Sequence, residues 1–169
     1  MEAFVARGVT PDQAEVAARL RFAGVLPDLR EAAVRACAGT TVLPPLDLWS
    51  CLAPDARRSV ERLAPATLPL PSGRSARLAY RADGSVLASV KLQEMFGLAR
   101  SPRVGPRGEP VTIELLAPNG RAVQTTRDLA SFWDTTYPEV RRALRGRYPR
   151  HPWPEDPWTA PPTHRVKPR

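Results

Sequence analysis

The hydrophobic period of this sequence changes near residue 66, and this change restricts the possible folds more than any other feature. Before it, apolar residues such as Val16, Leu20 and Phe22 recur at helical spacing. After it, short alternating runs are separated by Asp83-Gly84 and Asn119-Gly120, dipeptides that favour two-residue hairpin turns. The pattern predicts an α+β chain in which helices precede a small antiparallel sheet.

Residues 1–64 are expected to form a helical module. Proline and glycine positions delimit four predicted helices: residues 11–23 with Thr10 as the N-cap, residues 28–37, the segment LDLWSCL (46–52), and residues 54–64. The segment carries eight Arg against eight acids. It is therefore electrically neutral, and we predict a packing role for it.

Residues 65–127 are expected to form a small antiparallel β-barrel of the OB type. Two hairpins are predicted, SARLAYRA with SVLASVKL and VTIELLAP with RAVQTT. Between them, LQEMFGL is expected to form a helical turn and SPRVGPRGEP a loop. The strand count and order suit an OB-like barrel, and part of a β-sandwich is the alternative.

Residues 128–169 are expected to form a helical extension with a proline-rich tail. Asp128 is predicted to cap one helix, and a second helix is predicted from Pro138 to Gly146. Seven of the chain's 20 prolines lie in residues 149–169, which predicts an extended segment. Trp133, Trp153 and Trp158 are predicted to be core or docking anchors of this tail, with base stacking as the alternative.

The positive charge of the chain is concentrated in its second and third parts. The formal net charge is +8, and residues 120–169 carry nine Arg and Lys167 against five acids. Of the 25 cationic residues, 23 are Arg, whose planar guanidinium suits phosphates and stacks on bases. Nucleic acid is therefore the first partner to consider, whereas a genome that favours Arg codons would explain the same excess without a binding role.

One segment of the extension combines this charge with aromatic residues and is the candidate binding site. Its predicted nucleic-acid-binding residues are Arg141, Arg142, Arg145, Arg147, Tyr148 and Arg150, with Arg103 and Arg107 added from the loop expected at the edge of the barrel. The alternative is a solvated helix face whose arginines pair with Glu139, Glu155 and Asp156.

Patterns that would indicate an enzyme are missing from the sequence. It contains no GxxxxGK[ST] phosphate loop, acidic helicase box, GxSxG, HExxH or GxGxxG motif, and no spacing of carboxylates that suggests an acid–base pair. Cys37 and Cys51 are isolated, so neither a disulfide nor a zinc site is expected. We predict no catalytic residue, no metal site, no secretory signal, no membrane span and a cytoplasmic location.

The second half of the sequence resembles a known family. The segments that carry the resemblance are VKLQEMFGLARSPRV, VTIELLAPNGRAVQTTRDLASFW, YPEVRRALRGRYPRHPWPEDP and TAPPTHRVKPR. They are similar to the C-terminal region of HrpB-type DExH-box helicases of bacteria, and the similarity extends over about residues 45–169.

This resemblance implies an accessory C-terminal module of an ATP-dependent RNA helicase. In the family, ATP and Mg²⁺ are bound by a motor of two lobes, whose phosphate loop and acidic box have no counterpart in this sequence. No cofactor is therefore expected in this chain. The expected partners are single-stranded RNA or another nucleic acid, and the helicase motor lobes in cis or in trans. The alternative is a protein-interaction module that docks on a partner without touching nucleic acid.

Overall fold

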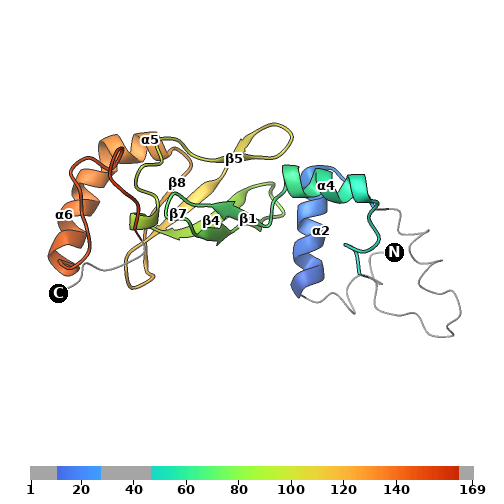
Figure 1. Cartoon of the computed structure of the whole chain (residues 1–169), viewed down its shortest axis with the longest axis horizontal. Coiled ribbons are helices and arrows are strands. Elements are labelled where there is room, and N and C mark those ends of the chain that lie inside the picture. The colour runs from blue at the N-terminus through green and yellow to red at the C-terminus, as the bar shows by residue number, and fades with distance from the viewer. Residues whose placement is uncertain (1–10, 28–46, 164–169) are drawn as a thin grey trace, which may run out of the picture. The chain divides into compact units, whose positions relative to one another are not determined.

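The computed structural model describes residues 11–27 and 47–163, which form a mixture of helices and strands (Figure 1). The chain divides into two compact units. The first contains the chain up to Pro65 together with Tyr80–Gly84, and the second contains Ala66–Ala79 and the chain from Ser85 onward. The predicted helix 28–37 and the predicted cap Thr10 lie outside the described residues. No helix in the described ranges is long and apolar enough to span a bilayer.

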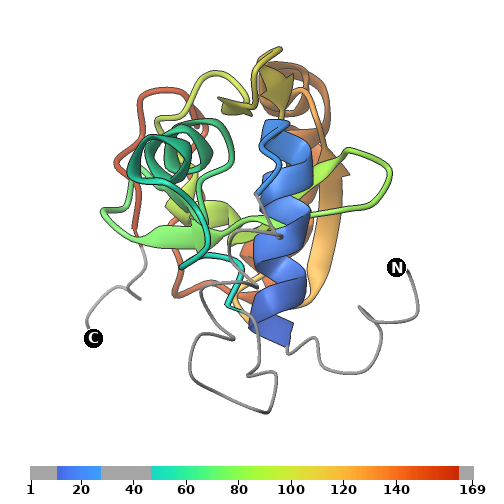
Figure 2. The same ribbon diagram turned by 90° about the vertical axis from the view of Figure 1, so that its right-hand side faces the viewer.

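In the residues that the structure describes, the first unit is built on two helices, α2 (Pro11–Ala23) and α4 (Pro54–Leu63), both of which the sequence predicts. Figure 2 looks along α4 and presents α2 lengthwise, so the two helices cross. A Schellman motif ends α2: Gly24 has a φ of +69°, its N–H bonds to the carbonyl of Arg21, and the N–H of Val25 bonds to that of Leu20. A residue with a Cβ would be strained in this left-handed conformation, which explains why glycine stands there.

The core of the first unit combines apolar side chains with one buried cation. Leu20 of α2 and Val60 of α4 are buried. The guanidinium of Arg19 lies over the ring of Trp49, 5.1 Å from its centroid, and its Nε donates to the carbonyl oxygen of Ala64 at 2.7 Å. The stacking and the hydrogen bond compensate for removing this charge from water.

The segment LDLWSCL does not form the helix that its apolar residues predict. Its described residues, from Asp47, form turns instead. The side chain of Asp47 accepts a hydrogen bond from the N–H of Trp49 at 3.0 Å, which is an Asx turn. An aspartate that binds the backbone two residues later offers the chain a local alternative to helix, and here that alternative prevails.

Within residues 11–27 and 47–163 the strands form three sheets, and all strands except part of β3 belong to the second unit. One sheet has the order β3-β4-β7-β8, and the others are the pairs β1-β2 and β5-β6. The bounds are β1 (Thr67–Pro69), β2 (Ser75–Arg77), β3 (Ala79–Tyr80), β4 (Val86–Lys91), β5 (Arg103–Val104), β6 (Glu109–Pro110), β7 (Thr112–Leu116) and β8 (Ala122–Thr126).

This topology corrects the predicted antiparallel barrel. The described strands do not close into a barrel, and β4 pairs with β7 in parallel, with Lys91 opposite Leu116. A parallel pair needs a crossover connection, here residues 92–111, which contain the 3₁₀ turn η1 (Leu92–Glu94) and the β5-β6 hairpin. The predicted strand SARLAYRA is divided, because β2 pairs with β1 whereas β3 lies beside β4. The predicted loop SPRVGPRGEP contains β5 and β6.

One face of the four-stranded sheet packs against the core of the second unit. In β4 the side chains of Val86, Ala88 and Val90 are buried, and in β7 those of Ile113 and Leu115 are buried. Alternation of buried and more exposed residues is what a strand with one covered face requires. The predicted Asn119-Gly120 hairpin is confirmed, since β7 and β8 are antiparallel on either side of it.

A continuous helical region follows β8. The carboxylate of Asp128 accepts from the N–H of Ser131 at 3.1 Å, so the predicted cap is confirmed. The region consists of α5 (Leu129–Ser131), a π-helical turn η2 (Phe132–Thr136) and α6 (Tyr137–Arg147). The predicted stop at Gly146 is one residue early, because α6 continues to Arg147.

Candidate nucleic-acid interface

Several arginines of helix α6 and of the turn after it are exposed. Tyr137 and Leu144 are buried, and their spacing gives α6 a single apolar face. The arginines Arg142, Arg145 and Arg147 are exposed, as is Arg150 just beyond the end of the helix. We call these four residues the α6 arginine surface. Arg145 and Arg147 lie in the last turn, where cations also interact favourably with the helix dipole.

Arg141, which the sequence groups with these residues, is engaged inside the protein instead. Its Nε donates to the carbonyl oxygen of Trp153 at 2.9 Å, and one of its terminal nitrogens lies 2.9 Å from Glu155 Oε1. Its side chain is only 21% exposed. The predicted alternative, an arginine paired with Glu155, therefore holds for Arg141. Asp156 pairs with no arginine in the described part of the chain, because its carboxylate accepts hydrogen bonds from the backbone N–H of Trp158 and from Thr159.

The proline-rich tail lies against α6 and the segment after β4 (Figure 1, dark red). The hydroxyl of Tyr137 donates to the carbonyl oxygen of Pro154 at 2.8 Å, and burial raises the pKa of this phenol. The N–H of Gly97 donates to the carbonyl oxygen of Pro157 at 2.9 Å, and the N–H of Thr163 to that of Gln93 at 3.0 Å. These bonds attach the tail along its length from residue 153 to residue 163.

The three predicted anchor tryptophans occupy different environments. Trp133 is buried in an aromatic cluster with Phe96, Phe132 and Tyr137, and its indole N–H donates to the carbonyl oxygen of Leu98. Trp153 is 7% exposed, and its indole N–H donates to the carbonyl oxygen of Tyr148 at 2.8 Å. Trp158 is half-buried. The faces of Trp133 and Trp153 are therefore covered by the protein itself and are not open to bases.

Tyr148 and His151 form the turn between α6 and the tail. The half-buried Tyr148 caps the helix, and its ring lies edge-on to His151, with centroids 6.2 Å apart. His151 is half-buried beside Trp153. Burial lowers the pKa of His151, and the positive charges of Lys91 and Arg150 lower it further. Lys91 is the exposed last residue of β4, and the sequence did not indicate that its charge would act on His151.

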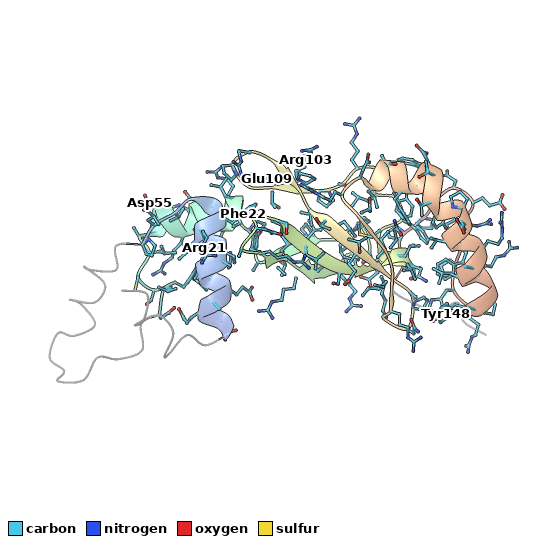
Figure 3. The ribbon with its side chains drawn as sticks, turned by 180° about the vertical axis from the view of Figure 1, so that it is seen from behind. Arg21, Phe22, Asp55, Arg103, Glu109 and Tyr148 are labelled. Carbon is cyan, nitrogen blue, oxygen red and sulfur yellow. The ribbon has the colours of Figure 1, made fainter. Side chains whose placement is uncertain are left out.

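Arg103 and Arg107 are not brought to the α6 arginine surface. They belong to the β5-β6 hairpin, and Figure 3 places Arg103 well apart from Tyr148 at the end of α6. One terminal nitrogen of Arg103 donates to the carbonyl oxygen of Gly108 at 2.8 Å, and Arg107 Nε lies 2.7 Å from Glu109 Oε1. Both guanidinium groups thus contact their own hairpin.

The described part of the chain contains no group of three or more His, Cys, Asp or Glu side chains that could hold a metal ion. Glu94 is a buried carboxylate in that part, and its partners are Ser72 and Arg74, each at 3.4 Å. These contacts indicate a structural role for Glu94 at the end of η1.

Comparison with known proteins identifies the family. Residues 32–157, well over half of the chain, match the family described as ATP-dependent helicase C-terminal. The curated ATP-dependent RNA helicase HrpB of Escherichia coli (strain K12) is 42% identical over 103 residues, which are 61% of this chain and 13% of that protein.

Two solved structures extend the comparison to the fold. The crystal structure of the E. coli DExH-box NTPase HrpB aligns with 93% of this chain at a TM-score of 0.80 and 29% sequence identity. The crystal structure of the Escherichia coli DEAH/RHA helicase HrpB aligns with 90% of this chain at a TM-score of 0.66 and 27% sequence identity. The chain spans only 22% and 23% of those two chains. The resemblance seen in the sequence is confirmed, and this chain belongs to the HrpB ATP-dependent helicase C-terminal family.

Proposed function

We propose that this chain is an accessory C-terminal module of an HrpB-type ATP-dependent RNA helicase and that it contacts single-stranded nucleic acid through the α6 arginine surface. The observation that carries the proposal is the exposure of Arg142, Arg145, Arg147 and Arg150 within nine residues, on α6 and just after it. None of the four forms an ion pair with a carboxylate of the described residues. Exposed cations of this kind attract a phosphate backbone, and the attraction depends on charge density more than on exact placement.

The proposed setting is beside the motor lobes of such a helicase, in cis or in trans. The relatives are several times longer than this chain, so most of their length lies outside the region compared. A docking module that does not touch nucleic acid is the alternative. That alternative uses the helices and the Trp-rich tail as contact surfaces, and the burial of Trp153 within the module weakens the part of it that uses the tail.

The salt dependence of binding tests the proposal. The purified chain should bind a fluorescein-labelled single-stranded oligouridylate with an affinity that falls as salt rises. The triple variant Arg142→Gln, Arg145→Gln, Arg147→Gln should lower the slope of log K against log salt by about 2, because each contact with a single strand contributes about 0.7. Fluorescence anisotropy at several salt concentrations measures both slopes. Arg141 is left unchanged because it holds the tail.

A matched control removes the same charge from another part of the chain. Arg58 and Arg62 are exposed on α4, and Arg127 is exposed after β8. The variant Arg58→Gln, Arg62→Gln, Arg127→Gln should keep the wild-type slope. Equal losses in the two triple variants would mean that binding is diffuse and would reject the assignment to α6. Oligouridylate binding that survives high salt and needs a tryptophan would instead indicate base stacking, and a folded chain that binds no oligouridylate would favour the docking alternative.

The chain by itself should hydrolyse no ATP. It contains no glycine loop with a lysine to hold the phosphates and no acidic box to hold Mg²⁺. The measurement is phosphate release from Mg-ATP, with and without oligouridylate. An ATPase activity that exceeds the protein-free blank and copurifies with the folded chain would contradict the proposal that this chain lacks a motor of its own.

A further inference from the structure

One edge of the four-stranded sheet lacks the features that usually protect a strand edge. Strand β8 ends the order β3-β4-β7-β8, and its outer side pairs with no strand of the described ranges. Edges are commonly protected by short length, by proline or by charged side chains within the strand. β3, at the opposite edge, has two residues, and the strands of the two separate pairs have two or three, with Pro69 in β1 and Pro110 in β6. β8 has five residues, AVQTT, and none of them is proline or charged.

The backbone of Thr125 in β8 points away from the sheet. Where β7 and β8 meet their turn, the N–H of Ala117 donates to the carbonyl oxygen of Arg121 at 2.8 Å. Because backbone groups alternate in direction along a strand, every second residue of β7 before Ala117 also faces β8, and Glu114 faces β4. Thr125 lies opposite Glu114, and the shift in register of this pair lies closer to the turn. The N–H and C=O of Thr125 are therefore directed outward, and no backbone hydrogen bond of the described loops and turns reaches them.

The two ends of β8 carry positive charge. Arg121 precedes the strand and Arg127 follows it, both are exposed, and neither forms an ion pair in the described part of the chain. Two acids near this edge are engaged within the protein. Glu114 accepts from the hydroxyl of Ser89 at 2.5 Å, and Asp128 caps the helical region. The edge thus presents an uncharged strand between two cations.

We propose that β8 is a docking edge for an extended segment of a protein partner that carries acidic side chains, and that this segment adds one strand to the sheet. Outward N–H and C=O groups match another peptide backbone, whereas a sugar-phosphate backbone has no amide donors. A second copy of β8 is disfavoured, because each copy would bring two arginines and no carboxylate to the same ladder. Acidic side chains near both ends of the segment complement Arg121 and Arg127. The inference goes beyond the proposed function and does not depend on the α6 arginine surface.

The first test removes the outward N–H. The isotope-labelled full chain is titrated with the end-blocked peptide Glu-Thr-Val-Thr-Val-Thr-Val-Glu, and its amide signals are followed by NMR. The largest shifts should fall on Thr125 and its neighbours in β8. Thr125→Pro should weaken binding by about ten-fold or more, because proline lacks the N–H and is tolerated where that group faces away from the ladder. Thr125→Ala keeps the N–H and should bind as the wild type does.

The second test changes charge alone, so it decides the question if Thr125→Pro does not fold. The double variant Arg121→Gln, Arg127→Gln should weaken binding of the acidic peptide about five-fold at low salt. It should bind a peptide with Gln in place of both Glu residues as tightly as the wild type does. The matched control Arg58→Gln, Arg62→Gln removes two exposed charges of α4 and should bind both peptides as the wild type does.

Four results would overturn the proposal. Equal affinities of a folded Thr125→Pro and of Thr125→Ala, or equal affinities of the two double variants for the acidic peptide, would reject the edge as its site. A dimer in sedimentation that Thr125→Pro abolishes would assign the edge to a second copy. Shifts of the same β8 signals with oligouridylate would assign it to nucleic acid.

The proposed function is tested separately from this edge. Thr125→Pro should keep the wild-type salt slope for oligouridylate, and the α6 triple variant should keep the wild-type affinity for the acidic peptide. Failure of the interface on α6 therefore leaves the docking edge standing, and failure of the docking edge leaves the interface on α6 standing.

Discussion

Replacing Phe96 with Ala should lower the free energy of unfolding of the second unit by about 3 to 5 kcal/mol. The side chain of Phe96 is fully buried, and its ring centroid lies 6.0 Å from those of Trp133 and Tyr137. Truncation removes these contacts and leaves a cavity beside Trp133 and Tyr137. Urea unfolding followed by tryptophan fluorescence measures the loss, because Trp133, Trp153 and Trp158 all lie in this unit.

The variant Phe96→Leu serves as its control. Leu keeps most of the apolar volume and loses the aromatic contacts, so its cost should be smaller than that of Ala, about 1 to 2 kcal/mol. Equal midpoints for the wild type and Phe96→Ala would show that the aromatic cluster does not carry the stability assigned to it.

Replacing Trp153 with Ala should release the tail from α6. Trp153 is nearly buried, its indole binds Tyr148, and its carbonyl oxygen accepts from Arg141. Loss of a buried tryptophan costs about 3 to 5 kcal/mol, which corresponds to an increase of about 100-fold to a few thousand-fold in the open population. Trypsin cleavage after the exposed Arg150, followed by mass spectrometry, should accelerate accordingly, because a protease cuts the opened chain.

Trp158→Ala provides the comparison for the tail. Trp158 is only half-buried and makes its hydrogen bond through the backbone, so its truncation should accelerate cleavage much less. A Trp153→Ala protein that resists trypsin as well as the wild type would mean that Arg141, Tyr137 and the backbone bonds hold the tail without the indole.

Local signals predicted those parts of the fold that depend on neighbouring residues. Pro11 and Gly24 delimit α2, Asp128 caps the helical region, and Asn119-Gly120 joins β7 to β8, as expected. Each of these is decided within a few residues of the chain by backbone preference or capping.

Pairings between distant segments could not be predicted in the same way. The parallel register of β4 with β7 depends on a crossover of about twenty residues, and no local pattern encodes it. At the candidate site, Arg141 and Arg145 look equivalent at helical spacing, but only Arg141 meets the returning tail.

Two of the hydrogen bonds that attach the tail are accepted by the carbonyl oxygens of its prolines. Proline has no N–H, so Pro154 and Pro157 can only accept, and the donors are the hydroxyl of Tyr137 and the N–H of Gly97. Six prolines between residues 149 and 163 also leave this segment without the alternating donors that an added β-strand would need. The tail can therefore bind its own unit through carbonyl groups and still offer no edge on which a second chain could extend a sheet.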